Sequence, residues 1–463
     1  MWFALGTIAG KAVALLSLPI FARLLTPAEF GRLDVLNALV SAGLATLLLG
    51  TDIAATRLYF DGRDAERQRI LSSWLVLVGA VVVPCAIALS LFASPISQSL
   101  FGNSDSALAV SLVGVVLLVG SIHVVVLGVL RTTGRAQAYG LLEGAALLLN
   151  AALAIVLLLA WRHDAAAVML ALAASWGVAA VVGLVAVRRA IAAPPTTSAV
   201  GALLRLGLPL APAVAAAFVG DFINRSLLLA TAGADQAGFL SIAIRVASIG
   251  GLLVAAAQLA WQPLAYRMGD APDALARLGD QGRRVLVSVA TLVTVLCALT
   301  PETIALLGGG RYAPAGPATA LCLVTVLLTG VYVVVSLPSA MAKATSDLGW
   351  SGMAGVATSL VVNTQLAPAM GASGTALAML AGQTVAVTVA AWRVRRHPRP
   401  SVWTMRTAAV VAVALAVGIL SASAWELPIV VRVALTIAVL ALAWIEGTLR
   451  SALADVLGWL RAR

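Results

Sequence analysis

The chain is dominated by apolar stretches that follow one another along almost its whole length, each long enough to cross a lipid bilayer. A helix of about 20 apolar residues spans a hydrocarbon core of about 30 Å, so these stretches predict transmembrane helices. Hydrophobic residues make up 61% of the 463 and charged residues only 11%, whereas a soluble chain would carry about a quarter charged residues. The sequence therefore predicts an all-α polytopic membrane protein.

We predict about 14 transmembrane helices. The hydrophobic N-terminus is interpreted as an uncleaved first helix, because Lys11 interrupts the apolar run and a signal peptide would begin with a basic region. The eleventh and twelfth helices are separated only by the stretch from Pro368 to Gly371. The predicted spans are 2–22, 33–59, 72–93, 106–130, 138–160, 165–187, 203–231, 237–266, 285–307, 315–342, 349–367, 372–392, 405–424 and 427–446.

The basic residues lie mainly in the connections on one side of the predicted helices. Of the 30 Lys and Arg residues, 21 fall in one alternating set of connections, five in the opposite set, and four inside the spans. Cytoplasmic connections carry an excess of Lys and Arg, so this bias places both termini in the cytoplasm. The net charge of +11 is explained by the same distribution, and no nucleic-acid partner is expected.

Three short matches at one spacing indicate an internal repeat of about 207 residues. The segment from Thr26 aligns with the segment from Gly233, which pairs Gly31 with Gly238. Because each copy would hold six helices, the copies share one orientation and would form two lobes with a site between them. We predict a six-helix lobe at 1–189, a linker at 190–202, a second six-helix lobe at 203–396, and two extra helices with a cytoplasmic tail at 397–463.

Four segments together resemble the polysaccharide flippases of the multidrug/oligosaccharidyl-lipid/polysaccharide exporter superfamily. They are FARLLTPAEFGRLDVLNAL from Phe21, LRTTGRAQAYGLLEGAALLLN from Leu130, FINRSLLLATAGADQAGFLSIAIRV from Phe222 and LLGGGRYAPAGPATAL from Leu306. The similarity extends over nearly the whole chain, including the fourteen-helix plan. None of the segments is a catalytic signature.

This resemblance implies a flippase that translocates undecaprenyl-diphosphate-linked oligosaccharide, such as an O-antigen or exopolysaccharide unit, by alternating access through a cationic cavity. It implies a multi-pass protein of the bacterial inner membrane. The implied partners are the lipid-diphosphate-linked oligosaccharide, membrane lipids, a proton or sodium counter-ion and a polysaccharide polymerase.

Four cations lie inside the predicted spans and are the candidate substrate-binding residues: Lys11, Arg57, Arg225 and Arg245. A charged side chain at the middle of a spanning helix costs roughly 3 kcal/mol on insertion scales, so each needs a partner or an anionic ligand. A guanidinium binds phosphate oxygens in a fork and an ammonium acts as a point charge. The structural alternatives are an ion pair for Lys11 and snorkelling to the headgroups for Arg57.

Three acids in the spans are candidates for charge pairing or ion coupling: Asp52, Asp221 and Glu143. Asp221 lies four residues before Arg225, so the two side chains share one helix face and can pair. Asp52 is expected to pair with a cation such as Lys11. For Glu143, a proton-coupling role and a paired structural role remain equally open.

The excess of buried cations over buried acids favours an anionic substrate over the alternative of a drug or cation antiporter of the same superfamily. A membrane-embedded polysaccharide polymerase or glycosyltransferase is disfavoured, because the longest connection has only about 18 residues. The three Cys and three His residues show no metal-ligand spacing. We expect no metal, no cofactor and no enzymatic activity.

Overall fold

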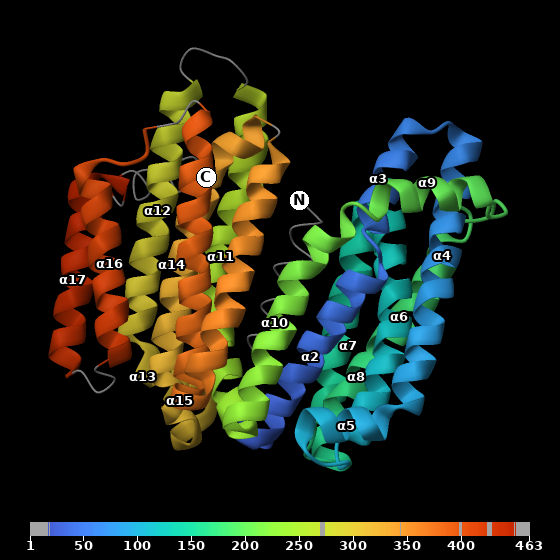
Figure 1. Ribbon diagram of the computed structural model, residues 1–463, viewed down its shortest axis with the longest axis horizontal. Helices are drawn as coiled ribbons and strands as arrows, with labels where there is room; N and C mark the ends of the chain where they lie inside the picture. Colours follow the sequence, from blue (N-terminus) through green and yellow to red (C-terminus); the bar gives the residue numbers. More distant parts are fainter. Residues whose placement is uncertain are drawn as a thin grey trace, which may run out of the picture. The chain divides into compact units, whose positions relative to one another are not determined.

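The computed structural model describes residues 17, 19–268, 274–342, 344–397, 401–423, 428–448 and 450. These residues form long helices joined by short connections, in two units divided after Gly238 (Figure 1). Twelve of the described helices are long and apolar enough to cross a membrane. The prediction of an all-α polytopic membrane protein is confirmed.

The first unit consists of nine helices and the start of a tenth within the described residues. Its helices α4, α6, α7 and α8 pack side by side, and α10 lies against α2 (Figure 1). The bounds are α2 Pro27–Leu47, α3 Thr51–Asp61, α4 Asp64–Leu91, α5 Ala93–Phe101, α6 Ala107–Thr132, α7 Ala136–Ala160, α8 Ala165–Val187, α9 Thr197–Gly207, α10 Ala211–Ala232 and α11 Ala234–Met268.

Local signals place several helix starts in this unit. Thr26 caps α2, because its hydroxyl accepts a hydrogen bond from the Glu29 N–H at 3.2 Å, and Pro27 occupies the first helical position. Asp164 caps α8 by accepting hydrogen bonds from the N–H groups of Ala166 and Ala167. These caps satisfy backbone donors that would otherwise be unpaired at the helix ends.

The predicted second span, 33–59, is divided into α2 and α3 by a break at Leu48–Gly50. Leu49 and Gly50 adopt left-handed backbone angles with φ of 53° and 66°. The hydroxyl of Thr51 donates to the Leu48 carbonyl at 2.5 Å and accepts a hydrogen bond from the indole of buried Trp74 at 2.9 Å. The freed backbone is thus satisfied by protein groups, as a break at membrane depth requires.

The helix α9 precedes α10 where the sequence predicted one span beginning at residue 203. It packs on α3 and α4, and its last residue, Gly207, lies against the break in the second span. A Cβ on Gly207 would lie 2.7 Å from the Leu49 carbonyl oxygen, so only glycine permits this approach. The backbone N–H of Thr196 donates to Ser73 on α4 at 3.0 Å, which anchors the preceding linker.

The second unit holds the rest of α11 and six further α-helices within the described residues. Helix α12 packs against α14, α16 and α17, and α14 packs against α15 (Figure 1). The bounds are α12 Ala274–Ala298, α13 Thr300–Gly308, η1 Gly309–Ala315, α14 Gly316–Met341, α15 Thr345–Arg393, η2 Val394–Arg396, α16 Met405–Ser423 and α17 Ile429–Glu446.

The long element α15 is two antiparallel helices rather than one. Gly371 has φ 58° and ψ −132°, which breaks the helix. Beyond it the chain folds back, so that a Cβ on Gly382 would lie 2.5 Å from the Gly355 carbonyl oxygen. Arg393 reaches Asp347 at 3.3 Å across the open end of this hairpin. The boundary predicted at Pro368–Gly371 is therefore confirmed.

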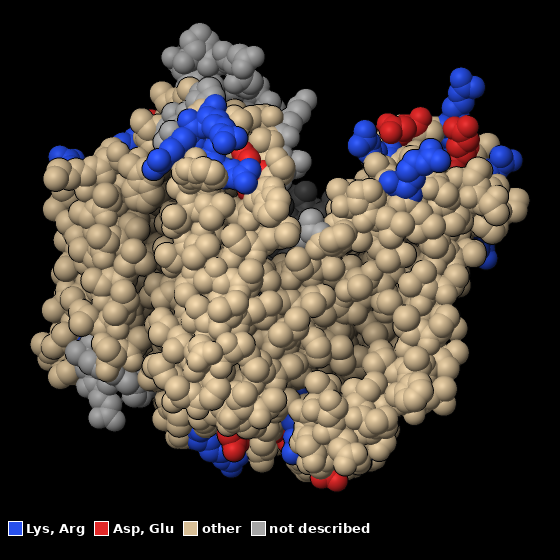
Figure 2. Space-filling model, viewed as in Figure 1, with Lys and Arg blue, Asp and Glu red and all other residues tan. Residues whose placement is uncertain are grey.

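With α15 counted as two, the twelve candidate spans become thirteen, and each corresponds to a predicted span. The first predicted span, 2–22, lies mostly outside the described residues. Figure 2 shows the charged side chains of each unit gathered at its two ends, with uncharged surface between them. That distribution is what a bilayer-spanning protein requires.

Candidate functional site

The helices α2 and α10 are joined by a buried ion triad built on Arg225. Its guanidinium contacts Asp221 in a fork, with Nη2 at 3.0 Å from Oδ2 and Nε at 3.2 Å from Oδ1. Its Nη1 also donates to a carboxylate oxygen of Asp34 on α2. Exposed side-chain fractions are 13% for Arg225 and 8% for Asp34, against 36% for Asp221.

The triad places two carboxylates on one guanidinium and therefore carries a net charge of about −1 when all three groups are ionised. The predicted pairing of Asp221 with Arg225 is confirmed, and Asp34 is a partner that the sequence analysis missed. Asp34 lies near the start of α2, and the sequence places it at the first end of the predicted span 33–59. Only the packing of α10 on α2 reveals that it is buried against a cation.

Near the triad, the first turn of α2 lies against the start of α11 through two glycines. A Cβ on Gly31 would lie 2.6 Å from the Gly238 nitrogen, and a Cβ on Gly238 would lie 2.7 Å from the Pro27 carbonyl carbon. Glycine is used in membrane helices where backbones approach closely. Gly31 is also pressed against the carbonyl of Ala234.

The glycine contact is reciprocal under the repeat that the sequence predicts. The offset of 207 residues relates Gly31 to Gly238 and Pro27 to Ala234. Gly31 lies against Ala234, and Gly238 lies against Pro27. The offset therefore converts each of these two contacts into the other. The duplicated unit and its lobe boundaries remain predictions.

The other predicted residues of the first unit lie away from the triad or outside the described residues. Lys11 lies outside them, so its predicted pairing with Asp52 stays a prediction. Asp52 stands in the first turn of α3, where a helix N-terminus favours an acid. The Arg57 side chain is 70% exposed and lies 3.9 Å from the equally exposed Asp61, a pair that contributes little to stability.

In the second unit, Arg245 lies on α11 and is partly buried. Its Nε contacts the hydroxyl of Ser241 at 3.4 Å, one turn earlier on the same helix. The predicted role of Arg245 in binding an anionic ligand stays a prediction.

Glu143 on α7 has a partner that the sequence analysis did not foresee. Its Oε2 lies 3.0 Å from Nε2 of His123 on α6, and the His123 side chain is only 4% exposed. The two residues lie at a similar depth in consecutive helices. This similar depth is the sequence signal from which the His123–Glu143 contact could have been predicted.

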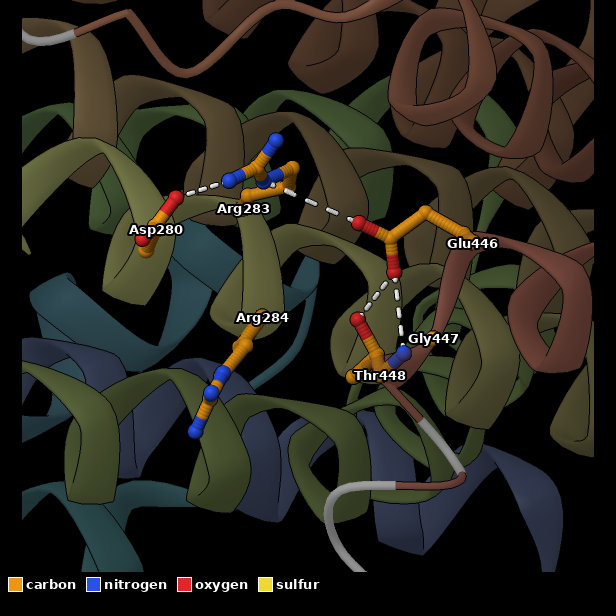
Figure 3. Close-up of a pocket in the computed structure, with 6 residues that line it drawn as sticks. All are labelled: Asp280, Arg283, Arg284, Glu446, Gly447 and Thr448. Carbon is orange, nitrogen blue, oxygen red and sulfur yellow. Dashed lines mark hydrogen bonds and ion pairs between the residues drawn. The ribbon is translucent and has the colours of Figure 1, made fainter. Parts of the chain in front are cut away.

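A pocket of about 270 Å³ lies where the first half of α12 meets the end of α17 (Figure 3). In it Arg283 lies between Asp280 and Glu446, and the Glu446 carboxylate accepts hydrogen bonds from Thr448. Arg284 points away from this chain of contacts (Figure 3). The polar groups satisfy one another and fasten α17 to α12.

Within the described ranges, no set of His, Cys, Asp and Glu side chains is arranged to hold a metal ion.

Residues 1–268 match the model of a protein family described as polysaccharide biosynthesis protein. The chain belongs to this family. The match covers all of the first unit and the part of α11 that carries Arg245. No curated protein matches the chain.

Solved structures show that this polysaccharide biosynthesis protein has the fold of a known group of transporters. The lipid II flippase MurJ, in an inward closed conformation, aligns with a TM-score of 0.72 and 12% identity over 96% of this chain and 98% of that one. An inward-facing multidrug resistance MATE transporter of the MOP superfamily aligns with a TM-score of 0.59 and 18% identity, over 88% and 94%.

A further MOP superfamily transporter, from Pyrococcus furiosus, is described as having a binding pocket of reverse polarity. It aligns with a TM-score of 0.52 and 15% identity, over 85% of this chain and 93% of that one. At these identities the alignments establish the fold alone. This polysaccharide biosynthesis protein is a multi-pass membrane protein with a flippase-like fold of the MOP superfamily.

Proposed function

We propose that the protein is a flippase that carries undecaprenyl-diphosphate-linked oligosaccharide across the bacterial inner membrane by alternating access. The observation that carries this proposal is the match of residues 1–268 to the polysaccharide biosynthesis family. The flippase-like fold supports it. So do two guanidinium groups, Arg225 and Arg245, inside apolar helices of that fold.

The headgroup chemistry assigns different parts to these two arginines. A diphosphate offers several anionic oxygens, which a guanidinium binds as a fork. Arg245 lies partly buried in the apolar helix α11, and it is the first residue proposed to hold the diphosphate. Arg225 is already neutralised by Asp34 and Asp221, so it binds substrate only in a state in which α2 and α10 have separated.

Asp34 changes the charge argument made from the sequence. With Asp34 included, four acids stand against the four cations, and the predicted excess of cations no longer holds. The case for an anionic substrate therefore depends on the family and on Arg245. The proposed orientation, with both termini in the cytoplasm, depends on the distribution of Lys and Arg.

Deletion of the gene tests the substrate class directly. We expect the deletion strain to lose surface polysaccharide and to accumulate lipid-linked repeat units on the cytoplasmic leaflet. Normal polysaccharide in a strain without a second flippase would contradict the proposal. Loss of polysaccharide without accumulation of the lipid-linked unit would indicate an earlier biosynthetic step, including the disfavoured membrane enzyme.

Substitution of Arg245 tests the assigned binding residue. We expect Arg245→Glu to abolish export at normal membrane abundance and Arg245→Lys to retain part of it, because the charge survives without the fork. Arg311→Glu is the matched control, since Arg311 is an exposed arginine of the same unit. Full export by Arg245→Glu would make this residue structural.

The second candidate function is a drug or cation antiporter of the same superfamily. It is favoured by the net charge of about −1 on the triad of Asp34, Asp221 and Arg225. A cation would bind between the two carboxylates once Arg225 moved away. Expression in a drug-sensitive strain separates the two functions, because an antiporter raises resistance to cationic drugs and a lipid-diphosphate flippase does not.

A further inference from the structure

A second buried charge cluster lies in the first unit, where α6, α7 and α8 pack together. His123 on α6 faces Glu143 on α7, with Nε2 and Oε2 3.0 Å apart. The imidazole is 4% exposed and the carboxylate 27% exposed. The proposed binding residues Arg225 and Arg245 do not contribute to this cluster.

The imidazole is held in place by an aromatic wall. The Trp176 indole on α8 stacks on His123, with ring centroids 6.1 Å apart and planes 20° apart. Gly120, one turn before His123, makes room for this indole, because a Cβ there would lie 2.6 Å from its ring carbons. Packing on one side and the carboxylate on the other therefore fix the ring.

The second ring nitrogen of His123 has no such partner. Nδ1 is buried and makes no hydrogen bond with the described residues. A neutral imidazole that donates from Nε2 to an ionised Glu143 leaves a buried acceptor at Nδ1, and the protonated ring leaves a buried donor there. Since buried polar groups are normally paired, the cluster is not arranged as a simple structural ion pair.

Both groups lie well inside the apolar segment. His123 stands nine residues before the end of α6 and Glu143 seven residues after the start of α7. At about 1.5 Å per residue, the pair lies about 10–14 Å from the end where these helices meet. An ionised carboxylate at such a depth is costly unless a positive charge or a proton compensates it.

Glu143 faces the packed side of α7 and not the lipid. Leu141 and Leu148 form the exposed stripe of α7, with 68% and 60% exposure. Glu143 lies on the opposite side of the helix, with the buried residues Ala146 and Ala154. The remaining exposure of its carboxylate therefore opens toward the helices that pack on α7.

Few other titratable groups surround the pair. Arg131 and Tyr139 stand nearer the ends of their own helices α6 and α7, and Tyr139 interacts electrostatically with both Arg131 and Glu143. Helix α8 contributes no titratable side chain between its ends. The other helices that pack on α6 carry Glu29, Arg32 and Asp34 on α2, Asp52, Arg57, Tyr59 and Asp61 on α3, and Glu66, Arg67, Arg69 and Cys85 on α4.

We propose that His123 and Glu143 form a proton-binding dyad that couples proton movement to transport. Neutral His123 with ionised Glu143 carries one negative charge, and one added proton makes the pair neutral overall. The loaded dyad is therefore cheaper to keep inside the membrane than the empty one. Because the dyad lies between α6, α7 and α8, gain or loss of the proton affects the packing of these three helices together.

This inference rests on the proposed flippase function for its coupling step, and the test separates the two. Purified protein in liposomes is given undecaprenyl-diphosphate-linked oligosaccharide and a pH gradient at zero membrane potential, and the distribution of the lipid between leaflets is measured. One proton coupled per cycle shifts that distribution by up to about tenfold per pH unit. We expect this shift in the wild type.

The variants His123→Gln and Glu143→Gln are expected to lose the pH-driven shift while still equilibrating the lipid. His163→Gln is the matched control, because His163 lies in an exposed connection, and it should behave as the wild type. An unchanged pH-driven shift in both dyad variants, or no shift in an active wild type, would overturn the proposal.

A second measurement requires neither the lipid substrate nor a transport assay. The chain has three histidines, so histidine-selective labelling gives a resolvable NMR spectrum of the protein in lipid nanodiscs. We expect the His123 resonance to change with pH, because the proposed dyad gains and loses a proton. A His123 resonance that does not change with pH would refute the dyad, even if the lipid is not flipped. A pH-dependent His123 resonance without flipping of the lipid would instead reject the proposed function.

Discussion

The close approach of α2 and α11 predicts a large effect from the smallest possible substitution. Gly31→Ala adds one methyl group whose Cβ would lie 2.6 Å from the Gly238 nitrogen. Non-bonded heavy atoms prefer separations of about 3.5–4.0 Å, so the two segments must move apart by about 1 Å. Overpacking of this kind costs about 1–3 kcal/mol.

The expected result is a loss of thermal stability together with a loss of export. If the contact exists in only one state of the transport cycle, a cost of 1–3 kcal/mol shifts the balance between states by about 5- to 150-fold. The control is Gly79→Ala on α4, where a Cβ meets nothing within 4 Å. There we expect unchanged export and a slight gain in stability from helix propensity.

The measurement is the melting temperature of the purified protein, with export measured in the deletion strain. The double variant Gly31→Ala with Gly238→Ala should lose less stability than the two single losses added, because one displacement relieves both clashes. Equal melting temperatures and equal export for Gly31→Ala and Gly79→Ala would refute the reasoning. Strict additivity in the double variant would show that the two glycines do not share one contact.

Three further predictions concern the triad, the hairpin and the driving force. Asp34→Asn should lower the free energy of unfolding by about 1–3 kcal/mol, since it removes a charged hydrogen bond from buried Arg225. The control Asp61→Asn, at an exposed ion pair, should change the free energy of unfolding by less than about 1 kcal/mol. Gly371→Ala should cost about 1–3 kcal/mol because Gly371 has φ 58°, while Gly352→Ala in the same hairpin has open space and should not lower the melting temperature. An inside-negative potential should speed outward flipping of the lipid-diphosphate in proteoliposomes without any ion gradient, at about 2.3 kcal/mol per charge per 100 mV. A rate that does not change with the potential would contradict this prediction.

Thirteen of the fourteen spans were predictable from the sequence because membrane insertion depends on the chain locally. Each segment must be long and apolar enough to cross the bilayer by itself, and the short connections carry the orientation signal. Even the weak boundary near Gly371 was correct, since proline and glycine interrupt helices through their own backbone properties. The breaks that the sequence analysis missed, at Leu48–Gly50 and before α10, are stabilised by partners distant in sequence, such as Trp74 for Thr51.

Some ion pairs were likewise predictable from the sequence, and others were revealed only by the structure. A pair four residues apart on one helix, such as Asp221 and Arg225, follows from helix geometry alone. The partners Asp34 for Arg225 and His123 for Glu143 come from other helices. Their pairing depends on which helix faces pack together, and the sequence does not state that. The sequence by itself thus determined a family, a series of membrane-spanning helices and a set of costly charges within them. Only the tertiary structure decided how those charges are compensated, because compensation at membrane depth requires a partner within a few ångströms in space and not along the chain.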